Sequence, residues 1–179
     1  MNKLNNIVTS IAFAATLFAG NAMAATDGGL GANSTGTSDV TLSIADRVQV
    51  TDVHDIALGA YGGTGNMTGT SDFCVYRSGG DNYKLTVTTD NGAYAVTSIS
   101  TGDSIPFTAQ VDDSLTAATT GEALSYNTAT STALVGSSSL TCGGVDNAQL
   151  YVSFAESDLQ AASTASDYQA TVTLYVEPI

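Results

Sequence analysis

The sequence predicts an all-β protein, an antiparallel β-sandwich of about eight short strands with one short helical turn. Large apolar residues alternate with Thr, Ser, Gln or Asp over short runs, as in strands that are buried on one face. Turns rich in glycine and asparagine separate these runs, and no long segment has the 3.6-residue period of a helix. A β-barrel fits the same pattern.

The first 24 residues have the pattern of a secretory signal peptide. Lys3 precedes an apolar stretch from Ile7 to Gly20, and Ala22-Met-Ala24 is a small-x-small cleavage site. The apolar stretch is short for a transmembrane helix. We therefore expect an exported chain that begins at Ala25, and its 155 residues suit one domain with its own core.

Two segments near the start of this chain differ in composition. Residues 25–38 are mostly Gly, Ser, Thr and Asn, which predicts a flexible tail. Residues 39–45, DVTLSIA, and 47–53, RVQVTDV, each alternate, which predicts one bent strand or two at the start of a single domain over 39–179. The apolar residues of the first run are Val40, Leu42 and Ile44.

The rest of the chain continues the strand rhythm. Further strands are expected around residues 73–76, 83–87, 94–96, 105–111, 150–154 and 168–176. Asp90-Asn-Gly92 predicts a hairpin turn, and Pro106 indicates an edge strand or a bulge. Residues 114–139 are expected to be mainly loop, with a short strand at most over 123–126, and residues 156–162 to form the helical turn.

The only two cysteines are Cys74 and Cys142. An even, small number of cysteines in an exported chain predicts a disulfide, and two buried free thiols are the alternative. Closing a loop of this length would stabilise the fold by about 4 kcal/mol in the chain-entropy model.

The charge of the chain excludes some partners. Without Lys3, three basic residues remain against 17 acidic ones, a formal charge of −14. Nucleic acid and anionic membrane surfaces would repel such a chain, so we expect neither nucleic-acid binding nor membrane insertion. The acidic residues are dispersed, as on a soluble surface kept apart by like charge.

No reaction is suggested by the sequence. His54 is the only histidine, and no G-x-S-x-G motif accompanies it. Zinc would need more His or Cys ligands, and no D-x-D-x-D-G calcium loop occurs. We therefore expect no catalytic residues, no metal and no cofactor, and we interpret the protein as a non-enzyme.

The two ends of the chain resemble a known family. The C-terminal run places an aromatic residue and then apolar residues at every second position: Tyr168, Ala170, Val172, Leu174 and Val176. This run resembles the closing strand of chaperone–usher fimbrial subunits. The run DVTLSIA, just before the first domain strand, resembles the donor strand of alpha-type and archaic spore-coat-U/Csu-like pilins.

The resemblance implies an incomplete immunoglobulin-like sandwich, exported through the periplasm to a cell-surface or extracellular fibre. Val40, Leu42 and Ile44 would be the donor residues that complete the next subunit. The implied partners are copies of itself, a periplasmic chaperone and an outer-membrane usher. An ordinary strand in its own closed sandwich is the alternative for these three residues.

Two other functions stay open at this point. The protein could be a self-contained secreted β-sandwich that binds a carbohydrate or a surface protein through exposed aromatic residues such as Tyr61, Tyr94 or Tyr126. An unusual secreted hydrolase that works through His54 is the weakest hypothesis.

Overall fold

A computed structural model describes residues 25–179, and the expected signal peptide lies outside them. The described residues fall into two units, residues 25–44 and Ala45–Ile179. In the first unit the main chains of Thr26 and Thr37 pair through two hydrogen bonds, with N···O distances of 3.0 and 2.9 Å. No strand or helix forms over residues 39–45.

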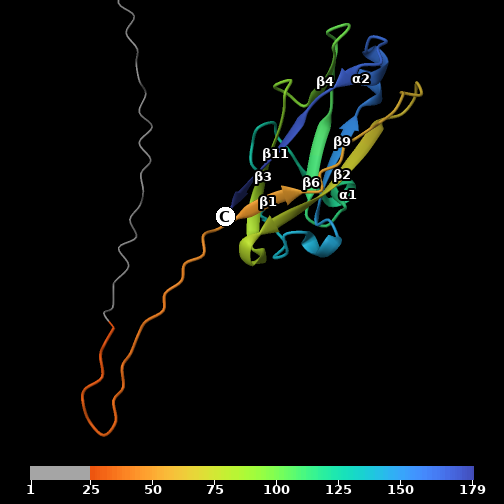
Figure 1. Cartoon of the computed structure of the whole chain (residues 1–179). Coiled ribbons are helices and arrows are strands. Elements are labelled where there is room, and N and C mark those ends of the chain that lie inside the picture. Colours follow the sequence, from red (N-terminus) through yellow and green to blue (C-terminus); the bar gives the residue numbers. More distant parts are fainter. Residues whose placement is uncertain (1–24) are drawn as a thin grey trace, which may run out of the picture. The chain divides into compact units, whose positions relative to one another are not determined.

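The second unit is an all-β sandwich with short helical turns, as predicted (Figure 1). Its strands are β1 (Val48–Thr51), β2 (Met67–Arg77), β3 (Asn82–Thr89), β4 (Ala95–Ser98), β5 (Ser104–Pro106), β6 (Thr108–Asp112), β7 (Glu122–Ala123), β8 (Leu134–Val135), β9 (Ala148–Phe154), β10 (Tyr168–Gln169) and β11 (Val172–Pro178). Its helices are α1 (Ala117–Thr120) and α2 (Glu156–Ala161), with 3-10 turns η1 (Ser78–Gly80) and η2 (Cys142–Gly144). Between residues 25 and 179, no helix has the length and apolar character needed to span a membrane.

All strand pairs are antiparallel and form three sheets. One sheet has the order β1-β2-β9-β6-β7, and the other two are β10-β4-β5 and β11-β3-β8. The chain connects the two smaller sheets twice: β3 leads into β4 through a turn, and β10 leads into β11. They supply the apolar residues that face the five-stranded sheet.

The core lies where the inward residues of the sheets meet. From the five-stranded sheet it takes Phe73, Val75, Ala109, Val111, Leu150, Val152 and Phe154. From the smaller sheets it takes Tyr83, Leu85, Val87, Ile105 and Leu134. These residues occupy alternate positions of their strands, which is why the period-2 pattern in the sequence located most of the core.

The structure differs from the expected strands in several places. Strand β2 begins at Met67, six residues before the strand expected around residues 73–76. The expected strand over 105–111 is two strands in different sheets, β5 and β6, and Pro106 ends β5 at a sheet edge. The C-terminal strand is interrupted at residues 170–171, where the chain passes from β10 to β11. No pattern in the sequence indicates α1, because its four residues are too few for a periodic pattern.

A buried arginine anchors the start of the sandwich. The Arg77 side chain is 4% exposed, and its Nη1 lies 3.0 Å from Oδ1 of Asp46. Its Nη2 also donates to the other Asp46 oxygen at 3.3 Å, and its Nε donates to the Asn82 carbonyl at 3.3 Å. A buried guanidinium needs such partners, because an unpaired buried charge is costly. The pair therefore fixes the beginning of the second unit against β2 and β3.

The predicted disulfide between Cys74 and Cys142 is confirmed. The Cα atoms are 5.9 Å apart, and the bridge joins β2 to η2 across a sequence separation of 68 residues. Cys74 is fully buried in the core strand β2, so the bridge ties the long loop before β9 to the centre of the larger sheet.

Removing this bridge should lower the free energy of unfolding. We expect the double variant Cys74→Ala/Cys142→Ser to lose about 2–5 kcal/mol, because the unfolded chain regains the entropy of a long open loop. Urea denaturation followed by circular dichroism measures the change. Wild-type protein unfolded with a reductant present is the control, and a loss below about 1 kcal/mol in both would contradict the prediction.

Asp112 at the end of β6 holds the α1 turn by hydrogen bonds. Its carboxylate accepts from Ser114 Oγ at 3.1 Å, from the Thr116 N–H at 3.0 Å and Oγ1 at 2.8 Å, and from Thr120 Oγ1 at 3.2 Å. Burial alone would raise the pKa of Asp112, but the hydrogen bonds from Thr116 and Ser114 outweigh it and hold the pKa below its ordinary value. The ionised carboxylate therefore stabilises the folded state at neutral pH.

Asp112→Asn should reduce stability at pH 7 by about 1–3 kcal/mol, since strong acceptors for several donors are lost. A lowered pKa contributes stability that is present at neutral pH and lost as the pH falls through the folded-state value. The difference from wild type should therefore shrink below about pH 4. Urea denaturation at several pH values tests this, with Asp81→Asn as a control, because the Asp81 carboxylate accepts no hydrogen bond within residues 25–179. A difference independent of pH would be the contrary result.

Candidate functional site

Strand β2 is longer than the strand beside it, and this leaves part of its edge open. Its last four residues pair with β1, and its first seven pair with β9 on the other side. β1 ends at Thr51, and the next residue, Asp52, has a φ of 57°. Because this left-handed conformation turns the chain out of the ladder, the edge from Met67 to Phe73 has no strand partner.

The chain from residue 52 to 61 follows this edge without forming a strand. It makes no main-chain to main-chain hydrogen bond. One hydroxyl connects it to β2 instead: the His54 N–H donates to Ser71 Oγ at 3.2 Å, and Ser71 Oγ donates to the His54 carbonyl at 2.7 Å. Ile56 and Leu58 pack over Gly69, where a Cβ atom would collide with both side chains.

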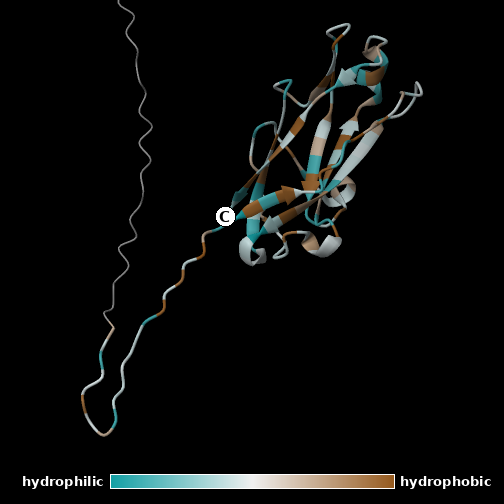
Figure 2. Cartoon of the chain, in the orientation of Figure 1, coloured by the Kyte–Doolittle hydropathy of each residue, from teal (hydrophilic) through white to brown (hydrophobic). Residues whose placement is uncertain are grey.

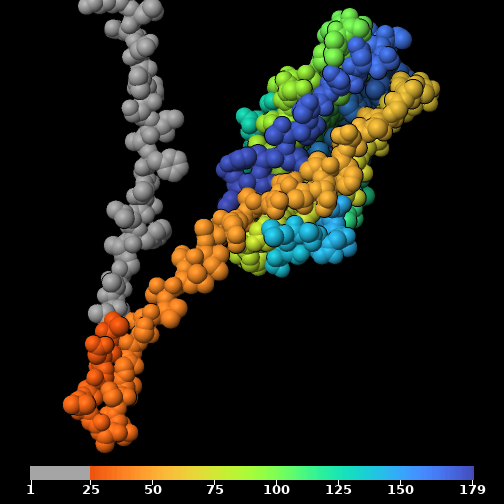
Figure 3. Space-filling view, viewed as in Figure 1, coloured from red at the N-terminus to blue at the C-terminus, as the bar shows by residue number. Residues whose placement is uncertain are grey.

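Strand β11 forms the opposite wall and is also an edge. It pairs only with β3, so its other side has no strand partner. Figure 3 shows the dark blue C-terminal strand running beside the orange chain that follows β1, and β1 and β11 lie close together without pairing. Leu174 is half-buried, whereas Val87, directly opposite it on β3, is 1% exposed. The core is therefore incompletely covered along β11.

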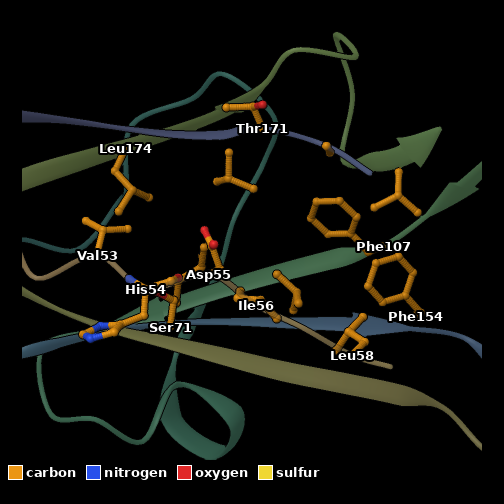
Figure 4. Close-up of a pocket in the computed structure, with 15 residues that line it drawn as sticks. Val53, His54, Asp55, Ile56, Leu58, Ser71, Phe107, Phe154, Thr171 and Leu174 are labelled. Atoms are coloured by element: carbon orange, nitrogen blue, oxygen red, sulfur yellow. Dashed lines mark hydrogen bonds between the residues drawn. The ribbon is translucent and has the colours of Figure 1, made fainter. Parts of the chain in front are cut away.

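Between these two walls lies an open apolar groove of about 290 Å³ (Figure 4). Its walls are Val53, His54, Asp55, Ile56 and Leu58 on one side and Ala170, Thr171, Val172 and Leu174 on the other. Its remaining lining comes from Ser71, Val96, Phe107, Leu150, Val152 and Phe154. Phe107 and Phe154 close one end, with ring centroids 5.2 Å apart, while His54 lies at the other end (Figure 4).

The structure brings together some of the residues singled out from the sequence. Ala170, Val172 and Leu174 line the groove. Val176 lies further along β11 and is half-buried, and Tyr168 lies in β10, where its hydroxyl donates to the Ser163 carbonyl at 2.8 Å. Neither of these two lines the groove.

The proposed donor residues lie in the first unit and are not covered there. Val40, Leu42 and Ile44 are 94%, 85% and 70% exposed. Figure 2 shows apolar and polar residues alternating along this part of the chain. Three large apolar side chains at every second position are thus available to another molecule.

Other groove residues were missed by the sequence reasoning. The sequence indicates His54 only as a candidate for catalysis and does not indicate Asp55, because a coil beside a sheet edge has no periodic pattern. Phe107 and Phe154 fall within runs expected to be strands, and pattern alone does not show that one side of a core is open. A usable signal was the pair Ile56 and Leu58, immediately before the glycine-rich residues 59–69.

Two of the aromatic residues considered for ligand binding, Tyr94 and Tyr126, take part in contacts within the sandwich. The hydroxyls of Tyr94 and Tyr126 donate to the main-chain carbonyls of Val87 and Thr89 at 3.2 and 3.1 Å, and their rings pack edge to face. Tyr61 is half-buried, with a buried hydroxyl that has no partner within residues 25–179. The nearest acceptor of the His54 ring is the main-chain carbonyl of Asp72, 3.4 Å away. In the same residues no cluster of three or more His, Cys, Asp or Glu could hold a metal.

Filling the space above Gly69 should loosen the wall formed by residues 52–61. We expect Gly69→Ala to lower the free energy of unfolding by about 1–3 kcal/mol, because the added methyl overpacks Ile56 and Leu58. Gly62→Ala is the matched control, since nothing lies within 4 Å of its would-be Cβ atom. Equal stability of the two variants in urea denaturation would show that this wall is not packed against β2.

Comparison with known proteins adds no family to this description. No family model matches the chain, and no curated protein matches its sequence at a significant level. The function proposed below therefore rests on the groove, on the exposed alternating residues 39–45 and on the chemistry of the residues in both.

Proposed function

We propose that this protein is a non-enzymatic structural subunit of a bacterial surface fibre that assembles by donor-strand complementation. The observation that carries the proposal is the open apolar groove along the unpaired edge of β11. In the assembled fibre, residues 39–45 of one copy occupy the groove of the next copy. Val40, Leu42 and Ile44 then fill positions that the chain's own strands leave uncovered.

The donor segment and the groove are chemically complementary. A strand rises about 3.3 Å per residue, so the three apolar residues of the donor span about 13 Å on one face. The edge of β11 offers main-chain donors and acceptors for strand pairing, and the groove beneath it is lined by aliphatic and aromatic side chains. Main-chain pairing at an edge with alternate side chains in pockets is a general mode of peptide recognition.

The energetics favour an occupied groove. Each large apolar side chain contributes about 1.5–3 kcal/mol when it is fully buried, so three residues offer several kcal/mol against the cost of ordering the segment. An unpaired edge above an open core is also a liability for aggregation. Donation by another copy removes the exposed apolar face of the donor and covers the edge of the acceptor at the same time.

The same proposal determines the partners and the route of export. The chain would be exported by its N-terminal signal peptide to the periplasm, and a periplasmic chaperone would cover the groove until assembly. An outer-membrane usher would then deliver the subunits to a fibre at the cell surface or outside the cell. The acidic surface, with only three basic residues after Lys3, is consistent with the absence of nucleic-acid binding in this proposal.

Fibre formation should depend on the inward face of the donor. We expect the mature wild-type protein to form a ladder on a denaturing gel when it is not boiled, and the ladder to disappear on boiling. The variant Val40→Ser/Leu42→Ser/Ile44→Ser should run as a monomer, because its donor has no apolar side chains to bury.

The matched control is Thr41→Ala/Ser43→Ala, which changes the other face of the same segment and should keep the ladder. Two results would count against donor-strand complementation. One is a ladder that survives the triple substitution. The other is a wild-type monomer whose stability falls in the triple variant, which would show that residues 39–45 complete their own sandwich.

A further inference from the structure

One charged side chain lines the groove at its centre. Asp55 belongs to the wall formed by residues 52–61, and Figure 4 shows its carboxylate pointing into the cavity toward β11. The side chain is exposed, and it takes part in no hydrogen bond or ion pair within residues 25–179. Water is therefore the only partner of this carboxylate while the groove is open.

The surroundings of Asp55 offer little compensation for its charge. No lysine or arginine lines the groove in the described part of the chain. On its own segment the ionisable neighbours are Asp52 and His54, and on β2 the neighbour is Asp72, whose carboxylate already accepts from Gln149 Nε2 at 2.7 Å. The lining from β11, β4 and β9 and from residues 107, 170 and 171 carries no charge. Beyond that lining, Asp90 accepts the Thr171 N–H at 2.9 Å.

A strand that enters the groove removes the water around Asp55. Burying an ionised carboxylate without a partner is far more costly than burying the neutral acid, so such groups take up a proton instead. The apolar residues of the proposed donor cannot compensate the charge, and the one ionisable residue within residues 39–45, Asp39, is also acidic. Two further acidic residues, Asp52 and Asp72, belong to the acceptor itself.

We infer that Asp55 is a specificity-determining residue that couples strand docking in the groove to proton uptake, so that acid promotes docking. This inference rests on the proposed function, because it requires a strand as the occupant of the groove. Docking is then disfavoured at neutral pH and strengthens as the pH falls. Subunit assembly would in this way respond to the acidity outside the cell.

His54 acts in the opposite direction and must be separated from Asp55. A positively charged imidazole near Asp55 would stabilise its carboxylate and weaken the effect of acid. His54→Gln should therefore keep the acid dependence or strengthen it. Asp55→Asn, which has nearly the same shape and no charge, should abolish it.

The test uses the full mature chain carrying the three donor substitutions to Ser, which leaves its own groove open. The probe is a labelled peptide with blocked ends, residues 39–45 with Asn in place of Asp39, so that the probe itself carries no ionisable group. Fluorescence anisotropy gives its Kd from pH 7.5 to pH 4.5. We expect binding at least tenfold tighter at pH 5 than at pH 7, since a fully coupled proton changes Kd about tenfold per pH unit.

Asp55→Asn should bind the peptide tightly at every pH, with Kd values within about twofold of one another. Asp52→Asn is the matched control, because it removes one charge from the same segment at a residue that does not line the groove. Asp52 has a φ of 57°, and asparagine tolerates this conformation. This variant should keep the wild-type pH profile.

The possible outcomes distinguish the role of Asp55 from strand docking itself. Binding that is independent of pH, or equally dependent on pH in Asp55→Asn, overturns the role of Asp55 and leaves strand docking intact. Binding that weakens in acid also overturns it. Absence of peptide binding at every pH in both the parent and Asp55→Asn rejects strand docking itself, and the inference falls with it.

Discussion

The structure depends on a mismatch in strand length. Strand β2 has 11 residues, whereas β1 covers only four of them, so one edge of the larger sheet is paired for part of its length and open for the rest. The open part faces the free edge of β11 across an apolar groove. A sandwich whose two edges do not meet leaves part of its core uncovered, and a further strand is the occupant that we propose for this space.

A disulfide and an ion pair hold one half of β2. The Cys74–Cys142 bridge and the Asp46–Arg77 pair both attach to the second half of β2, the half that pairs with β1. The half of β2 beside the groove is held on its open edge by the Ser71 hydroxyl, by a contact between the His54 ring and the Asp72 carbonyl, and by the packing of two aliphatic side chains. Strand β2 therefore has one firmly held half beside β1 and one weakly held half beside the groove. Local opening is expected in the half beside the groove.

Main-chain N–H groups and hydroxyl groups, rather than basic side chains, stabilise several carboxylates of the second unit. Hydrogen bonds from Ser163 lower the pKa of Asp103, and those from Ser98 and Ser100 lower the pKa of Asp167. Asp112 is held in the same way by threonines and a serine. Against this background Asp55 is unusual, since it lies in a groove lining and has no such donors within residues 25–179.

The sequence by itself determined the all-β class and the disulfide, because period-2 alternation is a local signal and the chain has only two cysteines. The hairpin predicted at Asp90-Asn-Gly92 is wrong: a turn forms there, but it joins β3 and β4, which belong to different sheets. The sequence also identified residues 40–44 as an apolar face and the C-terminal run as a strand. Only the tertiary structure decided that β1 stops at Thr51, that β11 is an edge, and that Asp55 points into the groove between them. These facts depend on which strands pair and where pairing ends, and pairing is set by contacts between residues far apart in the chain.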